Sequence, residues 1–249
     1  MNILRSTWFR IAAVLVVIAG MAGGGYGLWY VFLRPSDAPA VSVSGRPLPS
    51  LAGSADIPTA VVNDGDGEWA VNTGIGRFSD FTSSFVGYRV QEELAGIGGQ
   101  TAVGRTPQVS GSLTVRDRTV TAATISADLT ALVSDDERRD GQLRRQALET
   151  NAFPTATFVL TEPIALPAAG EDGSPQQGTA TGELTLHGVT RTVEVPMEGR
   201  LDGGVVVLTG SIDIEFADYG IQKPQAMIVL SVADHGTMEF QLFFTQVQG

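Results

Sequence analysis

Apolar and polar residues alternate along several stretches of the chain, which is the pattern of β-strands that bury one face. The clearest run covers residues 123–131, and similar runs cover residues 206–216, 228–232 and 238–244. Residues 233–237 form a short turn-like spacer between the last two runs, which predicts a hairpin whose strands pair antiparallel. The chain is therefore expected to build an antiparallel sheet.

A second strand pair is indicated by residues 181–196, where two alternating halves meet at His187 and Gly188 in a tight turn or bulge. Further strand-like runs occur at residues 83–90, 109–117, 119–132 and 155–160. Twisted sheets of about eight or nine strands often close on themselves, which removes their exposed edges. We predict a mainly β fold, with the strands closed into an antiparallel β-barrel.

One charged segment, residues 138–148, interrupts the strand pattern and predicts a short helical connection. Ser134 and Glu137 have the spacing of a capping box, and the acidic residues that follow Ser134 suit the positive end of a helix dipole. Leu143, Ala147 and Leu148 supply a narrow apolar stripe. The helix is expected to begin at Ser134, to end before Pro154 and to bridge two strands of the barrel.

A long apolar run near the amino terminus predicts a single transmembrane helix. Residues 11–33 carry no charge and, at 1.5 Å per residue, reach about 34 Å, enough to cross the hydrocarbon core of a bilayer. The alternative is a cleavable signal peptide, because Ala22 and Gly23 offer small residues near a possible cleavage point. The run continues well past that point, which favours an uncleaved anchor.

The anchor sets the expected organisation of the chain. Arg5 and Arg10 precede the apolar run and favour a cytoplasmic amino terminus with the rest of the chain outside. Residues 1–34 then form the anchor, residues 35–67 a flexible linker rich in Pro, Ser, Ala and Gly, and residues 68–249 the barrel domain. The expected location is the cell membrane, crossed once, with the barrel outside the cytoplasm.

The amino-acid composition excludes several classes of function. With 27 acidic and 16 basic residues the chain has a net charge of −11, which disfavours binding to nucleic acid phosphates. It has no cysteine, so neither disulfides nor a thiol nucleophile are available. Its two histidines, His187 and His235, lack metal-ligand spacing, and no serine nucleophile motif occurs. We therefore expect no enzymatic activity, no metal and no cofactor.

Three motifs occur in order along the predicted barrel domain. Arg139, Asp140 and Leu143 precede the segment Asn-Ala-Phe-Pro-Thr-Ala-Thr-Phe at 151–158, and Gly-Glu-Leu-Thr-Leu-His-Gly-Val-Thr-Arg-Thr-Val at 182–193 and Asp-Tyr-Gly-Ile at 218–221 follow. In these motifs the chain resembles the YceI-like family of lipid-binding, lipocalin-like barrels. It departs from the family near the first long strand, where it has Ser83-Ser84-Phe85 and Glu92-Glu93 in place of the family's histidines.

The resemblance implies an extended antiparallel barrel, periplasmic or extracellular, around an apolar tunnel that takes a polyisoprenoid or a similar chain. A barrel of about eight strands can instead fill with its own side chains. Small residues at inward positions, such as Ala123, Ala127, Ala131, Gly182 and Gly210, favour an open lumen. The candidate lumen residues are Phe85, Ile125, Ala127, Leu129, Leu143, Phe158, Leu184, Leu186, Ile212, Ile214, Ile228, Leu230, Phe240 and Leu242.

Arg139 and Asp140 are candidates for the mouth of the pocket, and their alternative role is an ion pair that ties the helix to the barrel. The function that these observations favour is a membrane-anchored extracytoplasmic binding protein for a long-chain apolar lipid. The alternative is a packed barrel without ligand that acts as an interaction or scaffolding module of the cell envelope, with an unknown protein partner.

Overall fold

The computed structural model describes residues 38–42, 65–94, 98–166, 174–224 and 229–247. The predicted anchor, most of the predicted linker and the candidate residue Ile228 lie outside these ranges, and of Leu230 only the backbone is described. Among the described residues, no helix has the length and hydrophobicity needed to cross a membrane.

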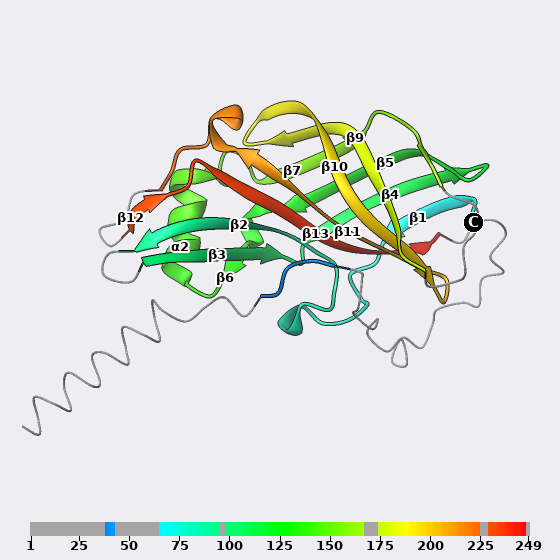
Figure 1. Cartoon of the computed structure of the whole chain (residues 1–249), viewed down its shortest axis with the longest axis horizontal. Helices are drawn as coiled ribbons and strands as arrows, with labels where there is room; N and C mark the ends of the chain where they lie inside the picture. Colours follow the sequence, from blue (N-terminus) through cyan, green and yellow to red (C-terminus); the bar gives the residue numbers. More distant parts are fainter. Residues whose placement is uncertain (1–37, 43–64, 95–97, 167–173, 225–228, 248–249) are drawn as a thin grey trace, which may run out of the picture.

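Within the described part of the chain, eight antiparallel strands form a closed ring (Figure 1). The ring closes because the first of them, β1, pairs with β4 on one edge and with β13 on the other. In ring order the strands are β1 (Gly67–Val71), β4 (Val109–Arg116), β5 (Thr119–Asp128), β7 (Thr155–Leu160), β9 (Gln176–Leu186), β10 (Val189–Asp202), β11 (Val205–Glu215) and β13 (His235–Gln246). The predicted mainly β, antiparallel barrel is confirmed.

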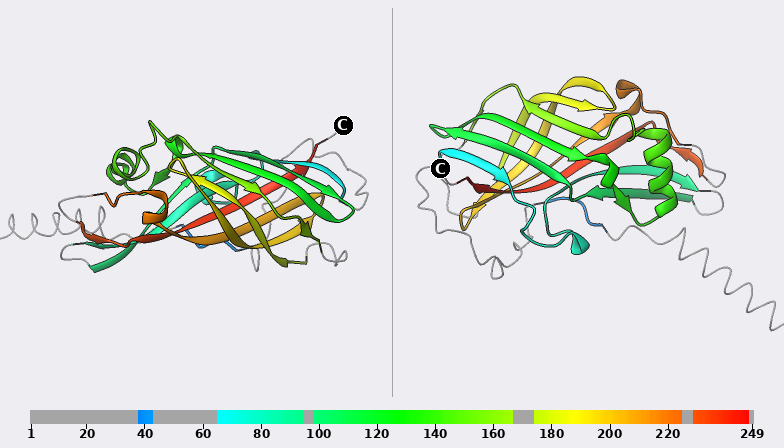
Figure 2. Two further views of the ribbon diagram at one scale, coloured as in Figure 1. Left: turned by 90° about the horizontal axis from the view of Figure 1, so that it is seen from above. Right: turned by 180° about the vertical axis from the view of Figure 1, so that it is seen from behind.

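The sheet extends beyond the ring at one end of the molecule. There β2 (Phe85–Leu94) pairs with the first half of β13 and with β3 (Gly98–Thr106), and β3 in turn pairs with the short β6 (Val133–Ser134). A helical segment lies beside this extension, as Figures 1 and 2 show. It consists of α2 (Glu137–Gln142) and the π-helical turn η3 (Leu143–Ala147), and this end of the molecule is called the helix end below.

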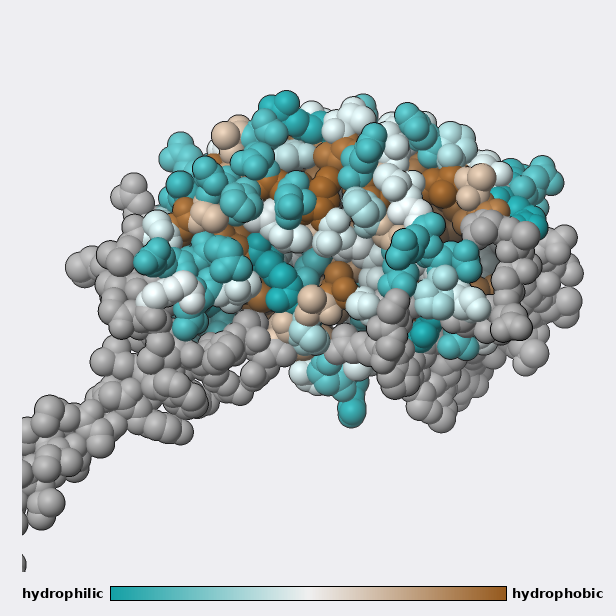
Figure 3. All heavy atoms as spheres, in the orientation of Figure 1, coloured by the Kyte–Doolittle hydropathy of each residue, from teal (hydrophilic) through white to brown (hydrophobic). Residues whose placement is uncertain are grey.

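Short elements complete the fold. The strand β8 (Ile164–Ala165) pairs with β5, and single 3-10 turns occur at η1 (Phe78–Asp80), η2 (Leu129–Ala131) and η4 (Phe216–Tyr219). Hydrophilic side chains cover much of the face seen in Figure 3, with smaller hydrophobic areas between them. Among the described residues, the exposed large apolar side chains are those of Val133, Val159, Leu166 and Val247. The alternating strands thus turn most of their large apolar side chains inward, as the sequence pattern predicts.

The hairpin predicted around residues 233–237 is wrong. The strand before it, β12 (Val229–Val232), pairs with the far half of β2, while β13 pairs with the near half of the same strand. The Ala233 amide donates to the Gln91 carbonyl, which keeps the chain running along β2 through the break. Residues 233 and 234 thus bend one long interrupted strand, and they do not reverse it.

The turn predicted at His187 and Gly188 is confirmed. Leu186 pairs with Val189, so these two residues alone connect β9 to β10. Both have a positive φ, 51° at His187 and 74° at Gly188, which is the backbone of the two-residue turn that matches the twist of a hairpin.

The predicted helix exists, but its first cap is Asp136 and not Ser134. The Asp136 carboxylate accepts hydrogen bonds from the amides of Arg138 and Arg139. Ser134 remains extended in β6 because it pairs with Gly104 of β3, and its hydroxyl donates to the Asp140 carboxylate at 2.6 Å. Asp136 satisfies the same capping rule as Ser134, two residues later.

Candidate ligand-binding site

The inner faces of the strands line two cavities. On β13, Met238, Phe240 and Leu242 point inward, and on β2 the inward positions are the even-numbered ones, which include Val86 and Tyr88. Alternation therefore decides which side chains a bound molecule could meet.

The larger cavity, the barrel cavity, lies inside the closed ring and has a volume of about 660 Å³. Apolar side chains of the ring strands dominate its wall, among them Trp69, Leu113 and Val206. Polar residues also belong to the lining, among them Arg118 after β4, Gln176 and Gln177 at the start of β9, and Arg200 near the end of β10.

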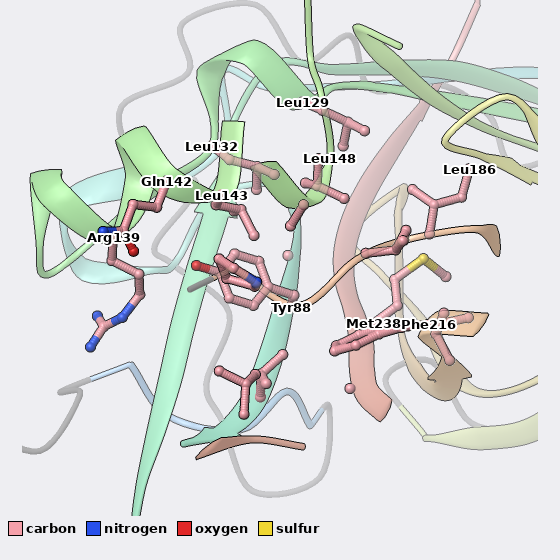
Figure 4. Close-up of a pocket in the computed structure, with 18 of the residues that line it drawn as sticks. Tyr88, Leu129, Leu132, Arg139, Gln142, Leu143, Leu148, Leu186, Phe216 and Met238 are labelled. Carbon is pink, nitrogen blue, oxygen red and sulfur yellow. The ribbon is translucent and has the colours of Figure 1, made fainter. Parts of the chain in front are cut away.

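The second cavity, the helix-end cavity, measures about 480 Å³ and lies between α2, η3, β2 and β13 (Figure 4). Leu132, Leu143 and Leu148 face Tyr88 across it in Figure 4, while Arg139 lies farther out. Its polar lining residues are Glu92, Asp136, Arg138, Arg139, Gln142, Gln222 and Thr237. This cavity is thus apolar within and charged toward α2.

The two cavities adjoin each other along the barrel. Val86, Ala156 and Met238 belong to the lining of both, so the two cavities share part of their walls. Each volume lies in the range of about 300–1,000 Å³ that small-molecule sites usually occupy. The interior is therefore not filled by the side chains of the barrel.

Most of the predicted lumen residues border this space. In the barrel cavity they are Ile125, Ala127, Phe158, Leu184, Phe240 and Leu242, and in the helix-end cavity they are Leu129, Leu143, Leu186 and Ile214. Ile212 lines neither cavity and packs instead in an apolar cluster with Leu184 and Tyr219. Contact of any of these residues with a ligand stays a prediction.

Phe85 does not belong to the lumen. It lies on the opposite face of β2 from Val86 and Tyr88, fully buried beneath the guanidinium of Arg105, which sits 4.1 Å from the centre of its ring. Because side chains alternate between the two faces of a strand, an assignment shifted by one residue places every side chain on the wrong face. The prediction that Phe85 faces the lumen was wrong in this way, because Val86 and Tyr88 occupy the inner face.

Arg139 and Asp140, the two residues predicted at the mouth of the pocket, lie in different surroundings. Arg139 lines the helix-end cavity and forms ion pairs with Glu92 at 3.5 Å and with Asp135 at 2.5 Å. Asp140 is buried and accepts hydrogen bonds from the amide and the hydroxyl of Ser134, so it ties α2 to β6. Both residues therefore tie α2 to the sheet, Arg139 through its ion pair with Glu92 of β2 and Asp140 through its hydrogen bonds with Ser134 of β6.

The prediction that small inward-facing residues leave the lumen open is confirmed only in part. Ala123 and Ala127 do line the barrel cavity. At Gly182, however, a Cβ would lie 2.4 Å from the ring of Phe158, and at Gly210 a Cβ would lie 2.6 Å from the ring of Phe240. These glycines make room for aromatic rings that lie across the strands, so they widen the lumen less than their size alone suggests.

The electrostatics of the helix-end cavity follow from burial. A tyrosine hydroxyl is protonated at neutral pH, and burial raises the pKa of the Tyr88 hydroxyl further. Burial also raises the pKa of the Glu92 carboxyl, and the neighbouring Arg139 cation offsets only part of this. For Arg139, burial works against the charged form, but the carboxylates of Glu92 and Asp135 outweigh it and raise the pKa of the guanidinium.

The motif residues meet at one point near the helix end. His187 of the β9–β10 turn bonds through Nδ1 to the Tyr219 carbonyl at 3.0 Å and through Nε2 to the Glu149 carboxylate at 3.1 Å. Its ring also packs on Phe153, with 4.4 Å between the ring centroids. His187 therefore joins three segments that are distant in sequence, and it has a structural role.

A further polar group was missed by the sequence analysis. Oxygen or nitrogen atoms of Glu215, Asp234 and His235 lie within 4.8 Å of one another, close enough to share a metal ion. All three residues are exposed, and exposed acidic groups of this kind are common without an ion. No spacing rule identifies this group, because Glu215 reaches the other two only through the pairing of β11 with β13.

A closed antiparallel barrel around an internal cavity is the architecture of lipocalin-like barrels. The family model of the YceI-like domain matches residues 79–244, so the chain belongs to the YceI-like family. No curated protein matches the chain.

Solved structures share the fold. A polyisoprenoid-binding domain from Saccharophagus degradans implicated in plant cell wall breakdown aligns with a TM-score of 0.53 and 18% identity, over 72% of this chain and 98% of that one. BcnA from Burkholderia cenocepacia aligns with a TM-score of 0.50 and 21% identity, over 64% of this chain and 95% of that one. At these identities the likeness concerns the fold.

Proposed function

We propose that the chain binds one long-chain apolar lipid, polyisoprenoid-like in character, along its two adjoining cavities. The observation that carries this proposal is the pair of largely apolar cavities, which lie side by side and share Val86, Ala156 and Met238 in their walls. Each buried methylene contributes roughly 0.8 kcal/mol, so several isoprene units would gain on the order of 10 kcal/mol before ordering and association costs. An extended chain suits this space better than a compact molecule does.

The family supports the same ligand class. The S. degradans domain of similar fold is described as binding polyisoprenoid. The chain keeps the family motifs at 151–158, 182–193 and 218–221, which converge on His187 beside the helix end. A binding role without catalysis fits this arrangement, since His187 is engaged in structural contacts.

The location belongs to the proposal as well. The uncharged run at 11–33 supports a single membrane anchor, and Arg5 and Arg10 support a barrel outside the cytoplasm. Amino-terminal sequencing of the mature protein tests the anchor. The expected result is a chain that keeps residues 1–33, whereas a mature end near Gly23 would replace the anchor by a signal peptide.

The alternative, a packed barrel that serves as an interaction module, conflicts with the unfilled interior. The two readings are separated by organic extraction of the purified full chain followed by mass spectrometry. We expect a long-chain lipid in a near-stoichiometric amount, and the same membranes prepared without the protein serve as the control. An extract that contains no lipid beyond this control would overturn the binding proposal and support the interaction module.

A further inference from the structure

The three side chains that line both the barrel cavity and the helix-end cavity differ in how far they can move. Val86 comes from β2, Ala156 from β7 and Met238 from β13. Ala156 has no side-chain rotamers to exchange, and the branched side chain of Val86 is stiff at χ1. Met238 is unbranched and has three rotatable bonds, so of the three it can change its shape most readily.

The backbone at Met238 is fixed, while its side chain borders open space. Met238 pairs with Tyr88 of β2 on one edge of β13 and with Ile212 of β11 on the other. It faces into the barrel and is nevertheless only half-buried, because it lines two cavities. Figure 4 shows it on the opposite side of the helix-end cavity from Arg139. Any movement at this position is therefore a movement of the thioether side chain.

The shared wall limits the length of a bound chain. A lipid that stays in the barrel cavity has about 660 Å³, and a longer one gains the 480 Å³ of the helix-end cavity only by crossing this wall. Strand pairing holds the backbone on either side of Met238, so a side chain has to turn aside to let the lipid pass. An exchange between staggered methionine rotamers disturbs no backbone hydrogen bond.

We propose that Met238 is the gate between the two cavities and that it sets the length of the lipid chain that the protein accepts. A short chain occupies the barrel cavity with Met238 in place. A long chain reaches the helix-end cavity after the Met238 side chain has turned aside. This inference rests on the proposed function and names the residue that determines its specificity for chain length.

Two isoprenoid alcohols with the same end group test the proposal: farnesol, with three isoprene units, and solanesol, with nine. The full chain in lipid nanodiscs is given an equimolar mixture, purified again and extracted. The retained solanesol-to-farnesol ratio is measured by mass spectrometry. It is divided by the ratio in empty nanodiscs, which removes the partition of each alcohol into the lipid.

Two substitutions at the gate should shift this ratio in opposite directions. Met238→Ala removes the side chain that has to be ordered aside, and it should raise the ratio by about 2- to 10-fold. Met238→Phe places a larger and stiffer ring in the shared wall, and it should lower the ratio by about 5-fold or more while farnesol is still retained.

Met197 of β10 provides the matched control. It is a half-buried methionine that lines the barrel cavity and does not belong to the described lining of the helix-end cavity. Met197→Ala and Met197→Phe change the side-chain volume by the same amounts away from the shared wall. The solanesol-to-farnesol ratio should therefore stay within about 2-fold of the parent in both.

The possible outcomes separate this inference from the function on which it rests. If neither alcohol is retained above empty nanodiscs, both are overturned. If the alcohols are retained but the Met238 variants leave the ratio unchanged, or the Met197 variants shift it as much, lipid binding stands and the gate is overturned. Thermal unfolding checks each variant first. If Met238→Ala does not fold, the ratio in Met238→Phe decides alone.

Discussion

Arg105 and Glu239 form a buried ion pair on the outer side of the barrel, although they lie 134 positions apart in the chain. The Arg105 guanidinium donates to Glu239 Oε1 from Nη2 at 2.6 Å and from Nε at 2.9 Å, and Arg89 donates to Glu239 Oε2 at 2.6 Å. The rings of Phe81 and Phe85 pack against the same guanidinium. This charge cluster fastens β2 and β3 to β13 where the sheet leaves the closed ring.

The first prediction concerns this pair. Glu239→Gln should lower the free energy of unfolding by about 3–5 kcal/mol, because it leaves the Arg105 charge buried without its counter-charge. Urea denaturation measures the change. Glu183→Gln on β9 is the control, since Glu183 is exposed, and it should stay within about 0.5 kcal/mol of the parent. Equal stability of the two variants would show that Arg105 relaxes toward water.

The segment after the predicted anchor is held by the same cluster, which gives a second prediction. Arg89 donates to the carbonyls of Ala38 and Pro39, and Arg105 donates to the Pro39 carbonyl. A chain that begins at residue 43 should therefore be less stable than one that begins at residue 35, by roughly 2 kcal/mol or more, since charged donors lose their acceptors. Equal thermal unfolding of the two truncations would mean that water replaces these carbonyls at no cost.

The third prediction follows from the corrected helix start. Ser134 acts on the helix through the Asp140 carboxylate, while Asp136 caps it. Ser134→Ala and Asp140→Ala should thus be non-additive in a double-mutant cycle, with a coupling free energy of about 0.5–3 kcal/mol. Asp136→Ala should cost about 0.5–2 kcal/mol by loss of the cap. A coupling energy near zero between Ser134 and Asp140 would contradict the assigned hydrogen bond.

The fourth prediction concerns pH. Because burial raises the pKa of Glu92 in the folded state, the folded chain holds that proton more tightly than the unfolded chain does. The contribution of Glu92 to stability is therefore greatest at low pH, and it is lost as pH rises from the ordinary carboxyl value of 4.5 through the raised folded value.

Glu92→Gln removes this titration. The stability of the parent relative to Glu92→Gln should fall across that window, with a slope no steeper than about 1.4 kcal/mol per pH unit, the limit for one proton. The check is urea denaturation of both proteins at several pH values, with Glu93→Gln at the exposed neighbouring position as the control. A stability difference that rises with pH would reverse the assigned direction.

Alternation was sufficient to predict the strands and most of the residues that face the lumen. It places Ile125 and Ala127 on the inner face of β5, since burial repeats with the period of the strand. Alternation does not indicate which other strand a given strand pairs with. For this reason β12 was expected to pair with β13, although it pairs with β2. The strand that pairs along a given edge is determined by hydrogen bonds between backbone segments that are distant in sequence.

The inner face of β2 and the buried ion pair were also not predicted from local sequence patterns. The strand that holds Tyr88 was predicted, but its inner face was read from Phe85, one position out of register. Arg105 and Glu239 sit at outward positions, where a charge is expected to be solvated. Phe81, Phe85 and the segment with Pro39 contact Arg105, and both charged residues are buried. Such burial arises from tertiary packing and leaves no periodic signal in the sequence.

The last prediction tests whether the lumen is an open tunnel. Ala127 is buried on β5 and lines the barrel cavity. Ala127→Trp should leave thermal unfolding nearly unchanged and abolish lipid recovery, because the new ring occupies space that the lipid chain needs. Thr124→Trp is the matched control, since Thr124 lies exposed on the outer face of the same strand and should keep the lipid. In a barrel filled by its own side chains, Ala127→Trp would instead overpack the interior and cost roughly 1–3 kcal/mol. Marked destabilisation with no lipid in either the parent or the variant would contradict the tunnel and support the interaction module.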